Sequence, residues 1–327
     1  MRVVVTGGAG FIGSHLVRAA LGGTLPGLEP SRLVVLDKLT YAGNLDNLAP
    51  VQDDPRLEVV VGDICDPAAL DRVLPGADAV LHLAAESHVD RSIAGAADFV
   101  VTNVVGTQTL LDGCLRHDVP TVVHVSTDEV YGSIAEGSWP ETHPVDPSSP
   151  YSASKAGSDL LALAYARTFG MDVRVTRCSN NYGPYQFPEK VIPLFVSNLL
   201  DGLQVPLYGD GLNVRDWLHV HDHCRGIALV LAGGRAGEVY NIGGGTELTN
   251  RELTDRLLAA CGAGPGMVKQ VPDRKGHDRR YSVDITKIRT ELGYEPSVPF
   301  DDGLRDTVEW YRANQAWWRP LKAAAAL

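Results

Sequence analysis

The chain has 327 residues, 44% of them apolar and 21% charged, which is the composition of a globular protein and excludes a disordered or fibrous one. This length allows one or two domains. The formal net charge of −11 argues against a nucleic-acid partner, because phosphate backbones are bound through basic patches.

The cysteines and the apolar runs indicate the cellular compartment in which the protein is expected to work. The five cysteines lie far apart and include no C-x-x-C pair, so we expect no bound metal or redox centre and a reducing, cytoplasmic environment. The apolar runs are strand-sized, and a glycine-rich segment follows almost directly on Met1. We therefore expect no signal peptide, no membrane-spanning helix and no membrane partner.

Short β-branched runs alternate with helical patterns through the first half of the chain. Runs typical of strands occur at 3–6, 33–36, 58–62, 79–83, 121–126 and 172–177. Continuous apolar strands separated by helices indicate a parallel sheet that is covered on both faces. The sequence therefore predicts an α/β fold with a Rossmann-type, doubly wound parallel sheet.

The first strand leads into a glycine-rich turn, and a helical pattern follows at 14–21. Gly7, Gly10 and Gly13 allow a tight turn, a close approach of a pyrophosphate to backbone N–H groups, and close packing of the helix on the sheet. Such a phosphate lies at the N-terminus of the helix. A glycine triplet alone is a weak signal, but its place between a strand and a helix predicts a dinucleotide site.

The ends of the next strands supply further cofactor candidates. Asp37 ends the second strand, where a carboxylate accepts hydrogen bonds from ribose hydroxyls and repels a 2′-phosphate, so NAD is favoured over NADP. Lys38 follows directly, and a cation there would tolerate the phosphate, which leaves NADP open. Asp63 and Ile64 after the third strand, and residues 83–87 after the fourth, belong to the same edge of the sheet.

Tyr151 and Lys155 are four residues apart at the start of a helix predicted over 151–168, so they lie on one face of that helix. A nearby ammonium favours the phenolate, which lets a tyrosine act as a base near neutral pH. The spacing alone is common. Behind a dinucleotide fingerprint, with Ser126 and Thr127 closing the preceding strand, it predicts a catalytic pair.

Beyond about residue 181 the pattern changes to loops punctuated by Pro and Gly, with helices predicted at 191–201 and 250–261. These pieces are too small to build a second core of comparable size. We therefore predict an NAD-binding Rossmann domain over 1–180 and a smaller C-terminal α/β cap, mainly for substrate, over 181–327. Segments within about 215–245 are expected to return to the main sheet.

These features resemble the extended short-chain dehydrogenases/reductases, and further segments resemble one family within them, the dTDP-glucose 4,6-dehydratases. The segments are 37–44 (DKLTYAGN), 85–92 (AESHVDRS), 126–132 (STDEVYG), 179–184 (SNNYGP), 215–218 (RDWL) and 273–278 (DRKGHD). The likeness covers nearly the whole chain. Residues 22–31 and the C-terminal tail lie outside it.

The adjacent acids Asp128 and Glu129 separate a dehydratase from other enzymes of this kind. An epimerase transfers hydride but needs no acid to expel a hydroxide, whereas a dehydratase does. A UDP-hexose 4-epimerase, a UDP-glucuronate decarboxylase and a non-catalytic NAD-binding homologue are the alternatives. The resemblance implies that dTDP-glucose is the substrate, and it leaves open the biosynthetic pathway that the enzyme serves.

The resemblance also implies a mechanism. Tyr151 takes the proton of the sugar 4-hydroxyl while hydride passes from C4 to NAD, and Thr127 hydrogen-bonds the same oxygen. Glu129 then removes the C5 proton, and Asp128 protonates the departing 6-hydroxyl. Hydride returns to C6, so NAD is regenerated in each cycle and behaves as a bound prosthetic group.

Further site residues are carried over from the family. The expected cofactor residues are Gly7, Gly10, Phe11, Ile12, Gly13, Asp37, Lys38, Thr40, Asp63, Ile64, Leu83, Ala84, Ala85, Ser87, Thr102, Tyr151, Lys155 and Asn181. The expected substrate residues are Ser87, Thr127, Asn180, Glu189, Lys190, Pro206, Tyr208, Arg215, Asn250, Arg274 and His277. Arg215 and Arg274 are the candidate phosphate partners, since a guanidinium contacts phosphate oxygens bidentately.

Two further expectations concern histidines and assembly. His88, His124, His219 and His221 lie in no metal-ligand pattern, so we expect structural roles for them. The helices near 100–116 and 151–168 resemble those with which the family forms a dimeric four-helix bundle. The resemblance therefore implies a homodimer.

Overall fold

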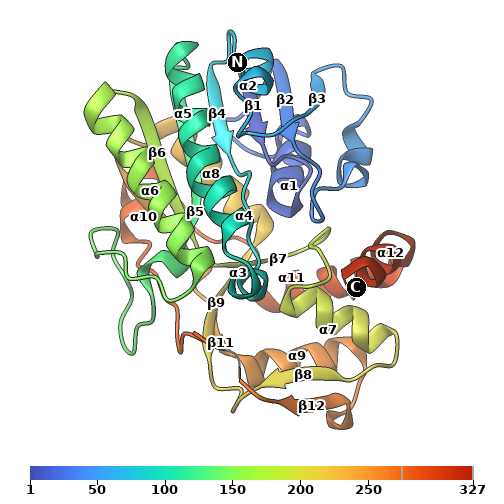
Figure 1. Ribbon diagram of the computed structural model, residues 1–327. Coiled ribbons are helices and arrows are strands. Elements are labelled where there is room, and N and C mark those ends of the chain that lie inside the picture. Colours follow the sequence, from blue (N-terminus) through green and yellow to red (C-terminus); the bar gives the residue numbers. More distant parts are fainter. Residues whose placement is uncertain (274, 326–327) are drawn as a thin grey trace.

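The computed structural model describes residues 1–273 and 275–325. Its centre is a seven-stranded sheet with the order β10-β6-β5-β4-β1-β2-β3, in which all neighbouring strands are parallel (Figure 1). The strands are β1 (Arg2–Thr6), β2 (Arg32–Asp37), β3 (Leu57–Val61), β4 (Ala79–His82), β5 (Thr121–Thr127), β6 (Asp172–Cys178) and β10 (Val239–Ile242). Six of them have the order of a doubly wound sheet, and β10 extends it at one edge.

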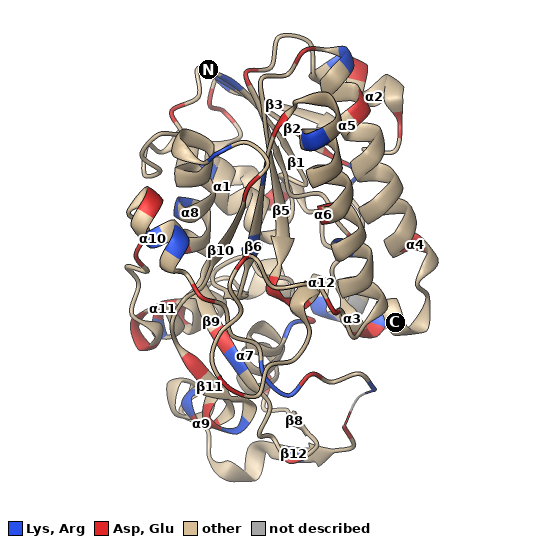
Figure 2. Cartoon of the chain, turned by 90° about the vertical axis from the view of Figure 1, so that its left-hand side faces the viewer, with Lys and Arg blue, Asp and Glu red and all other residues tan. Residues whose placement is uncertain are grey.

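Helices cover both faces of this sheet, because successive strand residues point to opposite sides. Val3 and Val5 pack into one apolar cluster and Val4 into the other, and all three are fully buried. One face carries α1 (Phe11–Leu21), α8 (Val220–Gly233) and α10 (Thr286–Leu292). The other carries α2 (Pro67–Val73), α5 (Thr107–Arg116) and α6 (Pro150–Phe169), and Figure 2 shows the resulting three layers.

The long helix α6 begins at a position set by its own sequence. Ser149 is the N-cap and forms a capping box with Ser152, and Pro150 occupies the first turn, where its missing N–H is no loss. Gly170 ends the helix in the left-handed conformation, with φ of 68°. These signals fix Tyr151 in the first turn of the helix.

The helical stretch before α5 is more divided than the sequence predicts. It consists of α3 (Val89–Ala94), α4 (Ala97–Val100) and a π-helical segment over Val101–Gly106. The wide π turn contains Asn103, whose amide nitrogen donates to the Glu86 carbonyl at 3.0 Å and to the Ser154 hydroxyl at 2.8 Å. Segments of this kind often occur at functional sites.

A smaller part with its own apolar core lies beyond the carboxyl ends of the strands (Figure 1). It contains a three-stranded sheet of β7 (Asn180–Tyr182), β9 (Val214–His219) and β11 (Glu247–Thr249), and a pair formed by β8 (Val205–Tyr208) and β12 (Val268–Val271). Its helices are α7 (Val191–Leu200), α9 (Asn250–Cys261), α11 (Phe300–Ala313) and α12 (Gln315–Ala325). Short 3₁₀ turns occur at Leu45–Val51, Asp128–Tyr131 and Pro265–Met267.

The return of the chain to the main sheet follows the sequence prediction in part. β10 pairs with β6, and α8 packs against β5 and β6, whereas β9 belongs to the smaller sheet. The division into domains over 1–180 and 181–327 stays a prediction. Among the described residues, no helix combines the length and the apolar character that crossing a bilayer requires.

Candidate functional site

A cavity of about 460 Å³ lies at the carboxyl edge of the main sheet, between that sheet and the smaller part. Loops after β1 to β6 form one wall, and α7, β8, β9 and α9 contribute to the other. The predicted cofactor residues that line it are Gly7, Gly10, Phe11, Ile12, Gly13, Asp37, Lys38, Thr40, Asp63, Ile64, Leu83, Ala84, Ala85, Ser87, Thr102, Tyr151, Lys155 and Asn181. The structure thus brings this whole predicted set together.

The glycine-rich turn forms a backbone cradle that only glycine can build. Gly7 has φ of 71°, and a Cβ there would lie 2.7 Å from the Ala84 Cα. A Cβ on Gly13 would collide with the Gly7 carbonyl. Gly10 is the N-cap of α1 and has no side chain to cap it, so the first N–H groups of the helix remain available to a phosphate. The residues present therefore fit a dinucleotide.

The adenosine end of the cradle favours a free ribose 2′-hydroxyl. The Asp37 carboxylate accepts from the Ala9 N–H at 2.9 Å and from the Leu39 N–H at 2.8 Å, and burial raises the pKa of Asp37. The Lys38 ammonium lies 2.9 Å from an Asp63 carboxylate oxygen. Because Asp63 already neutralises this cation, the feature that left NADP open carries less weight.

Thr127 is the central side chain of the catalytic end, at the last position of β5. Its hydroxyl donates to the Asp128 carboxyl at 3.3 Å and accepts from the Glu129 N–H at 3.2 Å. The same hydroxyl hydrogen-bonds the phenol of Tyr151. Thr127, Glu129, Tyr151 and Lys155 all line the cavity.

Asp128 has different surroundings from the other four predicted catalytic residues. Its side chain is buried, with the residue only 2% exposed, and it is not among the residues that line the cavity. Its Oδ2 atom has no hydrogen-bond partner within the described part of the chain. Burial, and then the charges of Glu129 and Asp216, raise the pKa of Asp128 well above its ordinary value. This shift favours the protonated carboxyl, which is the form that the predicted general acid needs.

The Tyr151–Lys155 pair departs from the sequence expectation. The Lys155 ammonium is buried and donates to the Val125 carbonyl at 2.9 Å, and burial lowers its pKa. Burial and the Glu129 carboxylate raise the pKa of Tyr151 well above 10, whereas its hydrogen bond with Thr127 acts in the opposite direction. The ammonium is directed to the strand, which is not the expected contact, and stabilisation of the phenolate by Lys155 stays a prediction.

The substrate end of the cavity is built mainly by the smaller part. The predicted substrate residues that line the cavity are Ser87, Thr127, Asn180, Glu189, Lys190, Pro206, Tyr208, Arg215, Asn250 and His277. Arg274 lies outside the described residues. Arg215 is buried, donates to the Asp278 carbonyl at 2.9 Å and stacks over the ring of Tyr281 at 4.2 Å.

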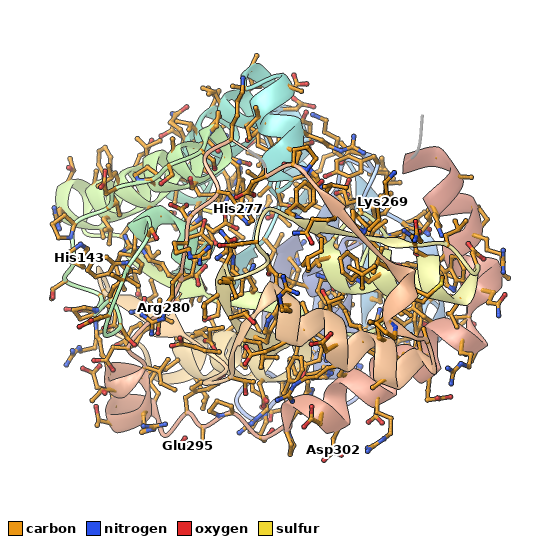
Figure 3. All side chains as sticks on the ribbon, turned by 90° about the horizontal axis from the view of Figure 1, so that it is seen from below. His143, Lys269, His277, Arg280, Glu295 and Asp302 are labelled. Atoms are coloured by element: carbon orange, nitrogen blue, oxygen red, sulfur yellow. The ribbon has the colours of Figure 1, made fainter. Side chains whose placement is uncertain are left out.

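His277 is held at this end by an ion-pair geometry, with its Nδ1 atom 2.6 Å from an Asp273 carboxylate oxygen. Seen from the side of the smaller part, it lies near the middle of the molecule, whereas Glu295 and Asp302 lie at the rim (Figure 3). His277 lines the cavity, where it can contact a ligand.

Several cavity residues were not found from the sequence. Gln186, Phe187, Trp217 and Tyr281 line the cavity as well. Gln186 and Phe187 follow the segment 179–184 directly, and Tyr281 follows the segment 273–278. Trp217 lies within the RDWL segment itself. The segments 179–184 and 273–278 would each need to be extended by three residues to include Gln186, Phe187 and Tyr281.

The histidines that were expected to be structural have structural contacts. His124 is buried with its Nε2 atom 3.3 Å from an Asp159 oxygen, and Asp159 also pairs with Arg177 at 2.9 Å. His88 and His219 accept backbone N–H groups as the N-caps of α3 and α8. His221 lies 3.3 Å from His15.

Comparisons with known proteins agree with this geometry. Residues 4–307 match the family model described as GDP-mannose 4,6 dehydratase. A dTDP-glucose 4,6-dehydratase of Streptomyces niveus is 64% identical over 323 residues, which is 99% of this chain and 96% of that protein.

Solved structures give the same result. A dTDP-glucose 4,6-dehydratase of Streptomyces venezuelae, with NAD and dTDP bound, is 66% identical and has a TM-score of 0.97, covering 98% of this chain and 100% of that one. A UDP-glucose 4-epimerase of Thermotoga maritima with UDP-glucose is 33% identical with a TM-score of 0.88, covering 96% and 100%. The fold is thus shared with epimerases, and the higher identity is with dehydratases.

Proposed function

The chain belongs to the GDP-mannose 4,6 dehydratase family. From its high identity to dTDP-glucose 4,6-dehydratases we propose that it converts dTDP-glucose into dTDP-4-keto-6-deoxyglucose and water with a bound NAD. The observation that carries this proposal is the pair Asp128 and Glu129, held by Thr127 next to Tyr151. A simple dehydrogenase or epimerase needs the tyrosine and the threonine but neither acid.

The first half of the reaction is an oxidation at C4. NAD supplies a hydride acceptor in this step and a hydride donor at the end. Tyr151 accepts the proton of the 4-hydroxyl, and the Thr127 hydroxyl orients the same oxygen. Tyr151 accepts this proton as the phenolate, so its own phenol proton must first have left to solvent; the raised pKa opposes that loss and makes the phenolate, when present, a strong base.

The second half is an elimination across C5 and C6. The 4-ketone acidifies the C5 proton, and Glu129, which lines the cavity, removes it. The electron pair of the C5–H bond forms the C5–C6 double bond as the C6–O bond breaks. Asp128 is not among the residues that line the cavity, so its carboxyl has to turn toward C6 to donate its proton to the departing hydroxide, which leaves as water. Hydride then returns to C6, and Glu129 returns the proton to C5.

The proton balance of the cycle gives Thr127 a second role, which is to pass a proton from Tyr151 to Asp128. After one cycle Tyr151 holds one proton more than at the start, and Asp128 holds one fewer. The Thr127 hydroxyl is hydrogen-bonded to both groups, so it can accept a proton from the phenol while it donates its own to the carboxyl. Because Asp128 is buried and does not line the cavity, we propose that the proton returns from Tyr151 to Asp128 through the Thr127 hydroxyl.

The test of the function combines cofactor and product. The purified protein should release about one NAD per chain on denaturation and should turn over dTDP-glucose without added NAD, because the redox cycle is internal. Recovery of mainly NADP would contradict the cofactor assignment. A panel of nucleotide glucoses assayed for the 4-keto product tests the base, and exchange of the 4-hydroxyl configuration without loss of water would indicate an epimerase instead.

The assembly and compartment are part of this proposal. We propose a homodimer through α6 and the helical stretch of α5 with the π-helical segment before it, because apolar side chains on α6 and on that segment are exposed; they include Val101, Val105, Leu160 and Phe169. We also propose that the NAD-binding domain spans 1–180, that the substrate cap spans 181–327, and that the enzyme works in the cytoplasm.

A further inference from the structure

Three segments that are far apart in the sequence meet beside the cofactor part of the cavity. The first follows β2 and contributes Thr40 and Ala42 to the cavity lining. The second runs from the end of β4 into the first turn of α3, and it contributes Ser87 and His88 to the lining. The third precedes α7 in the smaller part, over residues 185–190. The first two segments carry residues that are expected to bind the cofactor, such as Thr40 and Ser87, and the third belongs to the proposed cap.

Three side chains join these segments, one from each. The Arg91 Nε atom donates to the Glu189 carboxylate at 3.1 Å, and the Arg91 guanidinium carbon lies 3.9 Å above the centre of the Tyr41 ring. The Tyr41 phenol hydrogen-bonds the same Glu189 carboxylate. We name this triangle the Tyr41–Arg91–Glu189 clasp.

The clasp is strengthened by its surroundings. The Glu189 side chain is only 10% exposed, so its charge interactions are less screened than those of a surface pair. The ring of Phe187 packs edge-on against Tyr41 at 5.4 Å, and the Lys190 ammonium donates to the Ser87 carbonyl at 2.6 Å. The cap segment is therefore bonded to both cofactor segments.

We propose that the clasp retains the cofactor: it holds the cap segment against the two cofactor-binding segments, so that NAD leaves much more slowly than product does. Tyr41 and Arg91 are not among the residues that line the cavity, and so they act as positioning residues through the segments that carry them. This inference rests on the proposed function, in which NAD stays bound through many cycles. In this proposal cofactor release requires these segments to part, and parting them breaks the clasp.

The experiment measures cofactor release from the holoenzyme. Tyr41→Phe removes the phenol hydrogen bond and keeps the ring, and Arg91→Gln removes the charge. The matched control is Arg32→Gln, which breaks an exposed arginine–glutamate pair with Glu58 at 2.6 Å on the main sheet. Each protein is loaded with NADH and chased with excess NAD, and the loss of bound NADH fluorescence gives the release rate.

Both clasp variants should release NADH about tenfold faster than the wild type, a factor typical of losing one hydrogen bond to a charged group. The control should release it at the wild-type rate. Because the clasp is formed without cofactor as well, the variants should melt at a lower temperature, so release is measured well below melting; faster release with rescue by added NAD is what a merely structural role would not produce. After dilution the variants should lose activity and regain it when NAD is added.

Two outcomes would overturn the inference in distinguishable ways. If wild type and clasp variants carry NAD and release it equally slowly, the clasp has no role in retention and the proposed function stands. If the wild-type protein itself carries no NAD, the proposed function fails, and the clasp proposal fails with it.

Discussion

Asp128 and Glu129 are neighbours in the chain with different surroundings, and this difference supports different roles. Asp128 is buried, and its pKa is raised by burial and by two carboxylates. Glu129 lines the cavity, so its carboxylate can contact a bound substrate directly. A buried carboxyl with a raised pKa suits proton donation, and a carboxylate on the cavity wall suits proton removal from a bound sugar.

The first prediction separates oxidation from elimination. Tyr151→Phe should block every step, whereas Asp128→Asn should still permit hydride transfer from C4. Loss of one general acid typically slows a step by about 10²- to 10⁴-fold, so NADH should accumulate in the Asp128→Asn protein. Rapid mixing with dTDP-glucose, followed at the NADH absorbance band, measures this accumulation.

An isosteric amide keeps the shape of Asp128, so NAD content and melting temperature serve as the controls for intact structure. If Asp128→Asn loses oxidation as completely as Tyr151→Phe with both controls unchanged, Asp128 is not a dedicated elimination acid.

The second prediction concerns the return of the proton through Thr127. Thr127→Val keeps the volume of the side chain and removes the hydroxyl that joins Tyr151 to Asp128. The first turnover should slow, because the sugar oxygen loses one contact, and later turnovers should slow further, because Asp128 is no longer reprotonated. Rapid-quench assay of the 4-keto product should show a burst of about one product per chain, followed by a slow phase.

Thr127→Ser restores the hydroxyl and should abolish the burst. Equal slowing of the first and later turnovers in the valine protein would show that the hydroxyl only positions substrate.

The residues that could be predicted from sequence are those whose roles follow from backbone geometry. The cradle of Gly7 and Gly13 is such a case, because a strand-turn-helix pattern defines it locally. The orientation of Lys155 toward the Val125 carbonyl and the removal of Asp128 from the cavity surface depend on side-chain packing from distant strands. Spacing along one helix carries no information about such contacts.

At the scale of elements, the contact between α1 and the start of α8 contains two histidines. His15 on α1 lies 3.3 Å from His221 on α8, and burial, followed by the charge of Arg18, lowers the pKa of His15 to about 3. In an unfolded chain a histidine has a pKa of about 6.5. The packing of these helices therefore depends on a neutral His15.

The third prediction is that this contact makes the protein sensitive to acid. Below pH 6.5 the unfolded chain binds a proton at His15 that the folded chain does not bind, so the free energy of unfolding falls as the pH falls toward 3. His15→Gln removes this titration. Between pH 7 and pH 5 the wild type should lose about 2 kcal/mol more than the variant, since one pKa unit corresponds to about 1.4 kcal/mol.

Urea denaturation of both proteins at the two pH values measures the difference, and all other titrating groups are common to both. An equal loss in the two proteins would mean that His15 accepts its proton in the folded state.

The strands of the main sheet were predictable because each is a short apolar run, whereas α11 and α12 were not predicted. Their buried residues, such as Leu304 and Trp318, pack into the core of the smaller part against α7 and α9. Trp317 on α12 even donates to the Asn47 side chain at 3.0 Å, and Asn47 donates to the Ala9 carbonyl in the glycine-rich turn. Contacts across 270 positions of sequence leave no local signal.

At the scale of the whole molecule, the cavity lies between two parts with separate cores, while the helices proposed for assembly lie on the outside of the main sheet. Figure 2 shows α5 and α6 on the outer side of the sheet, away from α1, α8 and α10. Assembly through these helices leaves the cavity within one chain. It would also brace α6, whose first turn carries Tyr151.

The last prediction tests that assembly. The Leu160 side chain on α6 is 57% exposed in the single chain, and Val101 and Val105 are exposed on the adjacent π-helical segment. A two-fold interface repeats each of these residues on both chains, so one substitution introduces two buried charges. The wild type should scatter light as a dimer, twice the 35.1 kDa of one chain, and Leu160→Glu should shift it toward the monomer. The matched control is Leu203→Glu, a residue 52% exposed in the smaller part, which should stay dimeric because it lies on neither helix. A wild-type mass of one chain at micromolar concentration, or an unchanged dimer in the Leu160→Glu protein, would place the interface elsewhere or remove it.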